Sequence, residues 1–489
     1  MPDAIQQSET SAPVAPSTAS HHSADGASDD AGFRAAVARM RDAACERARP
    51  EVKDGAAPIR VMARMVNELV AEGRAEGIPE AIIAAEVVNR TIGDIDVRRI
   101  SATDDGPQFL SIADDMGLAL PGEVISGYVA KGRTYRWIQR RMQEIERELL
   151  AEHVDLRIYD LSSVGVMRLR EEIAAHIQRA WGVSFTPQQI YTSLGSTDGL
   201  CKFWQGLVAW RRQQGERAFA GVFPTPGFNV PEWQANNIGI RSVNIHARAE
   251  DQFKITPAAL AQSLDAAPDA RLIYLTISNN PTAFAYTPDE LHALYHMLDE
   301  RGSDLIVVAD LAYIGTGDPA ADRARMRALT EPKARTRTVY VGTFSKSHTL
   351  TGDRFGWVAF GAPELAKAVA VGWANTAASL PADWQLRYMS LLELFARRPR
   401  LESRIRALYR LRRARLVKQL TAINARRPIF ARINVDDDST VYNWSQLAPG
   451  EDVFSLFSKT GIAGVPGGAF GYSDDFVRLS VGCIPVPEV

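Results

Sequence analysis

The chain has 489 residues, which is long for a single domain and favours two. Its hydrophobic share of 46% is ordinary for a soluble globular protein, and its net charge of −2 gives no reason to expect binding to nucleic acid or to an anionic membrane. The cysteines Cys45, Cys201 and Cys483 match no disulfide or metal spacing, and there is neither a signal peptide nor an apolar stretch that could span a bilayer. We therefore expect a reduced, cytoplasmic protein without a metal site.

The first part of the chain divides into a tail and a helical region. Residues 1–32 are rich in Ser, Ala, Pro, Asp and Gly, and such a segment cannot bury enough surface to offset the entropy cost of ordering. We predict that these residues form a disordered tail. Residues 33–165 are mainly helical in pattern. Apolar residues at helical spacing over 137–149, and again over 166–181, predict two amphipathic helices.

The middle of the chain alternates short β-branched runs with helical patterns, which is typical of βαβ units and a mainly parallel sheet. The clearest runs cover residues 272–275, 305–308 and 339–341. Just past these runs lie Asn280, Asp310 and Lys346. Ligands of open α/β sheets bind outside the carboxyl ends of the strands, so these three polar residues predict one shared site.

Residues 391–420 are unusually basic and carry three apolar residues at helical spacing, Leu401, Ile405 and Leu408. A charge run of this kind is most often a solvated helix face. The alternative is that it recruits an anionic substrate.

Lys346 is the most informative residue of the sequence. It follows the apolar run 339–341, and poor solvation at a strand end favours the neutral amine that a Schiff-base lysine needs. Thr343 lies three residues before it and Arg354 eight after it. Both could hold a phosphate, Arg354 with bidentate geometry. This spacing favours a site over a set of unrelated loop residues.

Two motifs upstream could complete a site for pyridoxal phosphate, which needs phosphate donors and a flat group against its ring. Gly195, Ser196 and Thr197 open a helical stretch after an apolar run, where backbone N–H groups can bind a phosphate. Phe228 could stack on the pyridine ring. Ordinary turn chemistry and a buried core phenylalanine are the alternatives.

The remaining groups that this cofactor needs also have candidates. Asp310 could keep the ring nitrogen protonated, while Asn280 and Tyr313 could donate to the phenolic oxygen. Arg478, within a short apolar strand, could bind a substrate carboxylate bidentately. Taken singly, each residue has an alternative role: an Asx turn for Asn280, a helix N-cap for Asp310 and a structural ion pair for Arg478. Their occurrence together and in this order favours the cofactor site.

In this order the residues resemble the fold-type I pyridoxal-phosphate enzymes of the class I/II aminotransferase family. The resemblance runs from about Gly93 to Gly482, and its motifs are Asn280-Pro281-Thr282, Asp310-Leu311-Ala312-Tyr313 and Thr343 through Arg354. It implies an α/β fold class, with a large domain containing a mainly parallel, seven-stranded type of sheet flanked by helices. A smaller α+β domain would be formed by the N- and C-terminal segments. We assign residues 33–165 and 376–489 to the small domain and residues 166–375 to the large one.

The resemblance also implies roles for residues outside those motifs. Arg478 falls where the family holds the substrate α-carboxylate, and Gly93 belongs to a segment that approaches this carboxylate. Tyr159 resembles the tyrosine that reaches the phosphate of the neighbouring subunit. The resemblance therefore implies a homodimer with shared active sites.

The expected function is that of an enzyme acting on an α-amino acid through an external aldimine and Cα deprotonation by Lys346, and aminotransferase is the first choice. Two departures keep a lyase or synthase open: Ala283 replaces the usual glycine, and the connection over 97–158 is long. A further alternative is a cofactor-binding regulator in which residues 33–100 bind DNA. That segment is not notably basic and shows no clear recognition helix.

Overall fold

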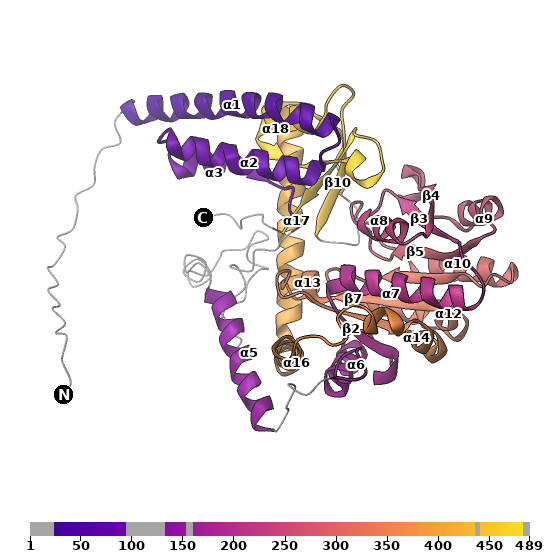
Figure 1. The fold of residues 1–489 in the computed structure, drawn as a ribbon. Coiled ribbons are helices and arrows are strands. Elements are labelled where there is room, and N and C mark those ends of the chain that lie inside the picture. The colour runs from indigo at the N-terminus through magenta and orange to yellow at the C-terminus, as the bar shows by residue number, and fades with distance from the viewer. Residues whose placement is uncertain (1–23, 94–132, 153–159, 436–440, 483–489) are drawn as a thin grey trace, which may run out of the picture.

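The computed structural model describes residues 24–93, 133–152, 160–435 and 441–482. At its centre is a seven-stranded sheet flanked by helices (Figure 1). The strand order is β2-β8-β7-β6-β5-β3-β4, and β8 alone runs antiparallel to its neighbours. The strands are β2 (Ile190–Leu194), β3 (Ala220–Thr225), β4 (Arg241–His246), β5 (Ala270–Thr276), β6 (Ile306–Asp310), β7 (Thr338–Thr343) and β8 (Phe355–Phe360). The predicted α/β class and mainly parallel sheet are confirmed.

Both faces of this sheet are covered, because its strands are apolar on both sides. Along β7, Val339 and Val341 pack into one hydrophobic cluster and Tyr340 into another, as the alternation of side chains along a strand requires. One face is covered by α7 (Gly195–Gln213), α8 (Val230–Asn237), α14 (Pro363–Val369) and α15 (Val371–Ala374). The other is covered by α6 (Met167–Trp181), α9 (Pro257–Ala266), α10 (Pro288–Glu300), α11 (Pro319–Leu329) and α12 (Pro332–Arg337).

Helices near the N-terminus share a hydrophobic core with the C-terminal strands. Met62, Leu420, Phe457 and Val477 meet in this cluster, and all four are essentially fully buried. The helices are α1 (Ala24–Lys53), α2 (Pro58–Ala75), α3 (Glu80–Glu86) and α18 (Val453–Thr460). The strands form an antiparallel sheet, β12 (Val465–Pro466), β13 (Phe476–Ser480), β10 (Tyr442–Leu447) and β9 (Phe430–Arg432), and a parallel pair, β1 (Val88–Asn89) with β11 (Ile462–Ala463). Residues 33–93 are therefore not the independent module that a DNA-binding regulator would need.

The amphipathic helix predicted over 137–149 is α5 (Arg133–Ala151), and it packs against α16 (Ala382–Arg397). Its apolar face, Ile138, Met142, Ile145 and Leu149, is buried in the cluster that also covers the large sheet. We assign both this segment and α16 to the small domain, and both pack into the cluster that also covers one face of the large sheet.

The basic segment 391–420 is not a simple solvated helix face. It contains the end of α16 and most of α17 (Arg400–Arg426) (Figure 1). The first part of α17 packs into the cluster that covers the α6 side of the large sheet, and its later part packs into the cluster of the N-terminal helices. Arg412 and Arg413 are buried, and Arg413 donates to the carbonyl of Tyr442 at 3.0 Å. Part of the predicted charge run is therefore structural, because buried guanidinium groups satisfy backbone carbonyls there.

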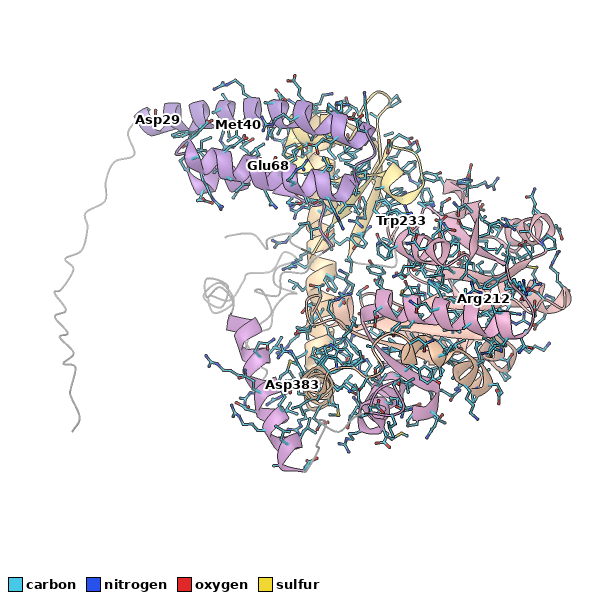
Figure 2. All side chains as sticks on the ribbon, viewed as in Figure 1. Asp29, Met40, Glu68, Arg212, Trp233 and Asp383 are labelled. Carbon is cyan, nitrogen blue, oxygen red and sulfur yellow. The ribbon has the colours of Figure 1, made fainter. Side chains whose placement is uncertain are left out.

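The predicted tail, residues 1–32, extends too far along the chain. Helix α1 begins at Ala24, and Asp29 lies near its start (Figure 2). Alanine has a high helix propensity, and carboxylates near a helix N-terminus interact favourably with its dipole, so this composition also suits a first helical turn. Residues 1–23 lie outside the described residues. No helix in the described part of the chain is long and apolar enough to cross a bilayer.

Candidate active site

Most of the predicted site residues lie at one edge of the large sheet. Gly195 follows β2, Phe228 follows β3, Asn280 follows β5, Asp310 ends β6 and Lys346 follows β7. Arg354 immediately precedes β8, and because β8 is antiparallel, its first residue lies at this same edge. The shared site predicted from the strand ends is therefore present in the fold.

Lys346 lies in the short helix α13 (Phe344–Ser347) and is half-buried. Its ammonium group donates a hydrogen bond to the carbonyl of Gly93. Its own carbonyl accepts a hydrogen bond from the hydroxyl of Tyr409, on α17, at 2.5 Å. Because Gly93 and Lys346 meet here, the segment after β1 and the short helix after β7 contribute to the same site.

A candidate anion site lies where α7 begins. Gly195 has a positive φ of 80°, and a Cβ there would lie 2.5 Å from Nη2 of Arg354, so only glycine allows this approach. Arg354 donates to the carbonyl of Thr351 at 2.9 Å and forms no ion pair with any described residue. Ser196 and Thr197 occupy the first turn, where backbone N–H groups face outward from the helix.

Thr343 contributes to this region differently from the prediction. Its hydroxyl donates to the carbonyl of Phe355 at 2.8 Å and accepts the N–H of Ser345 at 3.3 Å. The hydroxyl proton is therefore engaged by the backbone, and the geometry does not present it as a free donor to an anion.

Asp310 is buried, with its carboxylate held from two sides. One oxygen accepts the N–H of Ala312 at 2.8 Å and the other accepts the hydroxyl of Tyr274. Burial raises the pKa of Asp310 above its usual range, although these two hydrogen bonds oppose the rise. Tyr274 was not predicted from the sequence, because a tyrosine in a buried strand is ordinary and only the sheet register brings it to Asp310.

Arg478 lies on β13 and is buried. It donates to Oδ1 of Asn280 at 3.0 Å and to the carbonyl of Thr91 at 2.8 Å, while its Nε has no partner. Among the described residues no carboxylate pairs with it, so the alternative of a structural ion pair receives no support there. A buried guanidinium held only by neutral acceptors is a strong candidate to bind a carboxylate from a ligand.

Tyr442, on β10, is the most important residue that the sequence analysis missed. Its ring lies under the guanidinium of Arg478, with 4.5 Å between Cζ and the ring centroid. Its hydroxyl is 3.3 Å from that of Tyr313, and it would be 2.2 Å from a Cβ at Gly93. No motif surrounds Tyr442, so strand pairing alone brings it to the site.

The two tyrosine hydroxyls differ in acidity. Burial, followed by the neighbouring Tyr442, raises the pKa of Tyr313 well above its usual value. Burial also opposes ionisation of Tyr442, but the positive charges of Arg478 and Lys346 outweigh it and lower the pKa of that phenol. Tyr442 is therefore the more acidic partner of the pair.

Two predicted residues are not joined to this cluster by the described contacts. Phe228 is half-buried between β3 and α8, which does not match the alternative of a buried core phenylalanine. The neighbouring Gly227 N–H donates to the carbonyl of Phe470 at 3.1 Å, so the loop does face the C-terminal segment. Tyr159 and most of the long connection lie outside the described residues.

The residues present fit pyridoxal phosphate. A protonated ring nitrogen would compensate the buried carboxylate of Asp310, and a phosphate would match Arg354 and the N-terminal turn of α7. The absence of a side chain at Gly195 keeps this approach open, and Lys346 supplies the amine. Asp310, Arg354, Gly195 and Lys346 would thus hold the cofactor, which supplies a ring able to accept electrons from a bound amino acid.

Comparison with known sequences gives the family. The family described as aminotransferase class I and II matches residues 135–486, and the chain belongs to this family. The aspartate aminotransferase of Geobacillus stearothermophilus is 29% identical over 208 residues, which is 42% of this chain and 49% of the relative. An aspartate aminotransferase of Pinus pinaster is 26% identical over 327 residues, 65% of this chain and 64% of the relative. The chain thus spans about half the length of several curated relatives that it matches.

Solved structures agree on the fold. The chain is similar to the aspartate aminotransferase of Thermus thermophilus with maleate, with a TM-score of 0.60 and 21% identity over 85% of this chain and 91% of that one. An aromatic aminotransferase from Pyrococcus horikoshii gives a TM-score of 0.61 and 20% identity over 84% and 94% of the two chains. At this identity the likeness establishes the shared fold.

Proposed function

We propose that the protein is a pyridoxal-phosphate-dependent aminotransferase acting on an α-amino acid. The observation that carries this proposal is the convergence of Lys346, Asp310 and Arg354 at one sheet edge, in a chain that belongs to the aminotransferase family. Arg478, buried and without a carboxylate partner in the described part of the chain, supports an amino acid as the substrate. The names of the relatives also support transfer of an amino group.

Each residue has a role that follows from its surroundings. Arg478 binds the substrate carboxylate, and this orients the Cα proton toward the Lys346 amine, which removes it as a general base. Asp310 would stabilise a positive charge on the ring nitrogen of the cofactor, because its buried carboxylate would gain a partner. Asn280 and Tyr313 would hold the phenolic oxygen. Gly93 shapes the substrate side of the site, since its carbonyl already contacts the lysine.

We further propose that the enzyme works as a homodimer in the cytoplasm. Tyr159 would reach the phosphate in the neighbouring subunit, as the family resemblance implies. Phe228 would stack on the ring, and Ser196 and Thr197, with Thr343, would line the phosphate end. The division into a small domain, from residues 33–165 and 376–489, and a large one, from 166–375, belongs to the same proposal. The cluster shared by the N-terminal helices and the C-terminal strands supports it, whereas α5, α16 and the first part of α17 pack into a cluster that also covers one face of the large sheet.

The first experiment tests the lysine. Lys346→Ala is expected to lose the absorbance band of the lysine–cofactor Schiff base, because the variant lacks the amine that we propose holds the aldehyde covalently. Lys367→Ala is the matched control, since Lys367 is exposed on α14. It should keep both the absorbance and the activity. An unchanged spectrum in Lys346→Ala would refute the proposed role of this residue.

The second experiment tests the reaction. The holoenzyme is mixed with a panel of α-amino acids, and the products are separated by mass spectrometry. An aminotransferase converts the cofactor to its amine form and releases one 2-oxo acid for each amino acid consumed. Release of ammonia together with a β- or γ-leaving group would instead indicate elimination and would overturn the aminotransferase assignment.

A further inference from the structure

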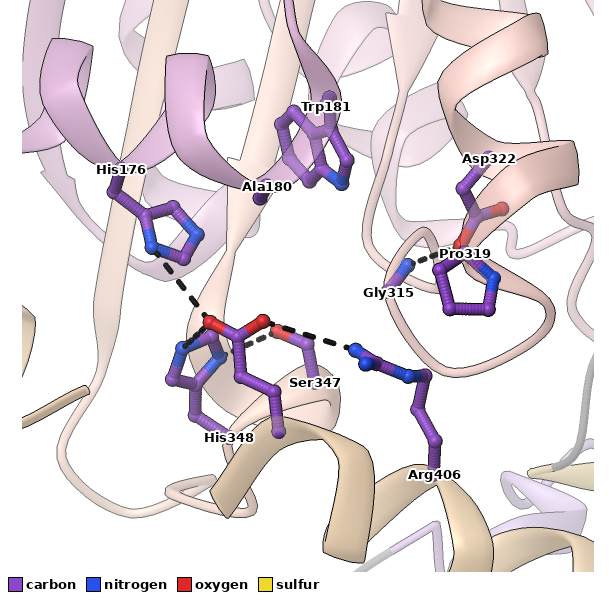
Figure 3. A pocket seen from close by; sticks show the side chains of 10 residues that line it. His176, Ala180, Trp181, Gly315, Pro319, Asp322, Ser347, His348 and Arg406 are labelled. Atoms are coloured by element: carbon purple, nitrogen blue, oxygen red, sulfur yellow. Dashed lines mark hydrogen bonds and ion pairs between the residues drawn. The ribbon is translucent and has the colours of Figure 1, made fainter. Parts of the chain in front are cut away.

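A second cluster of chemically active side chains includes His348, which lies two residues past Lys346 in the sequence. His176 comes from α6 and His348 directly follows α13 (Figure 3). Glu402 lies on α17. One nitrogen of each imidazole and one carboxylate oxygen all lie within 4.8 Å of one another. Nδ1 of His176 is 4.0 Å from Oε1 of Glu402, and Nε2 of His348 is 3.6 Å from the same oxygen. The proposed aminotransferase reaction uses none of these groups.

His348 provides independent evidence that a ligand belongs here. Its side chain is only 2% exposed, and Nε2 has no hydrogen-bond partner within 3.5 Å, its nearest acceptor being Oε1 of Glu402 at 3.6 Å. Its Nδ1 lies 2.8 Å from the hydroxyl of Ser347. If Nδ1 carries the proton and donates it to Ser347, the lone pair of Nε2 faces Glu402. This is the arrangement in which a metal-binding histidine is usually held by its other nitrogen.

The carboxylate of Glu402 is also oriented so that it could bind an ion. Its Oε1 faces both imidazoles, while its Oε2 faces Arg406, whose Nη1 is 3.7 Å away. The cluster borders a cavity of about 30 Å³ that Trp181 and Pro319 also line. A water occupies roughly 10–15 Å³ by the same measure, so the cavity has room for an ion and a bound water.

We propose that His176, His348 and Glu402 bind a divalent transition-metal ion, for which zinc is the best match. Two imidazoles and one carboxylate suit zinc, whereas calcium and magnesium prefer sites made of oxygen alone. Bonds of about 2.0–2.2 Å in a tetrahedron place ligand atoms about 3.3 Å apart. The two imidazole–carboxylate separations of 3.6 and 4.0 Å approach this value, and the three ligand atoms lie within 4.8 Å of one another, so the side chains would have to rotate inward to complete the site. A water takes the fourth position.

This inference changes an expectation from the sequence, which predicted no metal. The three ligands lie far apart in the chain and share no motif. Folding alone brings α6, the loop after Lys346 and α17 together. A bound ion would hold these three elements to one another and would restrict the short helix α13, which carries Lys346. The proposal does not rest on the proposed enzymatic function.

The test measures metal binding by the full-length protein. The protein is stripped with a chelator and titrated with Zn²⁺ by calorimetry, and with Co²⁺ followed by its visible d–d bands. We expect one ion for each chain. Glu402→Gln preserves shape and should weaken binding at least about 100-fold, and His176→Phe should do the same while keeping the aromatic packing against Phe344. Thermal unfolding of each metal-free variant shows whether it is folded.

Two controls make the outcome decisive. His292 and Glu331 form an exposed pair at 3.0 Å, so His292→Phe removes a surface histidine and should leave Zn²⁺ binding unchanged. Lys346→Ala should also keep the ion, which separates this proposal from the cofactor. The inference is overturned if the wild-type protein binds no ion, or if folded Glu402→Gln and His176→Phe bind Zn²⁺ as tightly as the wild type.

Discussion

At the scale of single residues, the site is defined by charges that burial leaves poorly compensated. Asp310 and Arg478 are both buried, and each is held by neutral groups rather than by an opposite charge among the described residues. Such residues cost stability in the folded chain and gain partners when a ligand of complementary charge binds. This is why they are strong candidates for function.

Replacing Asp310 with Asn should stabilise the cofactor-free protein at neutral pH. Burial raises the pKa of Asp310, so the folded state binds more protons than the unfolded state from about pH 4 upward, and the free energy of unfolding falls as the pH rises through that window. Asp310→Asn cannot ionise, so it removes this loss and should be the more stable of the two proteins at pH 7.5. Denaturant melts at pH 4 and pH 7.5 measure it, with exposed Asp304→Asn as the control. An equal stability difference at both pH values would contradict the argument.

Replacing Tyr442 with Phe should weaken amino acid binding. The variant keeps the ring under Arg478 but loses the acidic hydroxyl near Tyr313 and Gly93. One hydrogen bond is worth about 1 kcal/mol, so KM should rise about fivefold, with a smaller change in kcat. Steady-state kinetics measure both constants. Tyr472→Phe, in a half-buried position outside the site, should leave them unchanged, and identical kinetics for the two variants would rule out a role for the Tyr442 hydroxyl.

At the scale of elements, backbone geometry decides where side chains can approach. Gly195 uses a left-handed conformation at the start of α7, and so does Ala283 after Asn280, with φ of 67°. The family has glycine where this chain has Ala283. The departure therefore keeps a conformation that glycine adopts more easily, at a cost of roughly 1 kcal/mol or more.

Gly195→Ala should impair cofactor binding beyond its effect on stability. A Cβ would clash with Arg354, while Gly215, with a similar φ of 85°, has open space around it. Both Gly195→Ala and Gly215→Ala should lower the free energy of unfolding by about 1–2 kcal/mol through backbone strain. Only Gly195→Ala should also raise the dissociation constant for pyridoxal phosphate, which fluorescence titration measures. Equal affinities in both variants would show that the approach of Arg354 does not matter.

At the scale of the whole molecule, α17 joins two hydrophobic clusters, the one that covers the α6 side of the large sheet and the one that contains the N-terminal helices. The N-terminal helices contribute to the cluster that also includes Phe457 and Val477, so segments from both ends of the sequence depend on each other. Cys45, on α1, is buried against the carbonyl of Phe454, and burial raises the pKa of its thiol to about 11. Its reactivity therefore reports on the docking of α1.

Met62→Ala should loosen this docking. Met62 is fully buried, and its truncation should cost about 2–5 kcal/mol. Met167→Ala, 42% exposed, is the control and should cost little. In a background lacking Cys201 and Cys483, a thiol reagent at pH 8 should label Cys45 faster in Met62→Ala than in either the wild type or the control. Unchanged labelling would show that α1 does not depend on this core.

Much of the site could be predicted because its chemistry lies at strand ends. The runs before Asn280, Asp310 and Lys346 became β5, β6 and β7, and the order of these residues along the chain was enough to indicate the family and its cofactor. The strands are recognisable locally, since buried parallel strands are continuous apolar runs. The start of α1 was predicted less well, because its composition suits both a tail and a helix.

By itself, then, the sequence determined the class of the fold, the family and the lysine, because these depend on patterns that are contiguous in the chain. Only the tertiary structure decided that Tyr442 lies between Arg478 and Gly93, that Tyr274 binds Asp310, and that α5 packs with the large cluster. It also decided that His176, His348 and Glu402 meet. Strand register and helix packing set such contacts, and both are long-range properties that no local pattern carries.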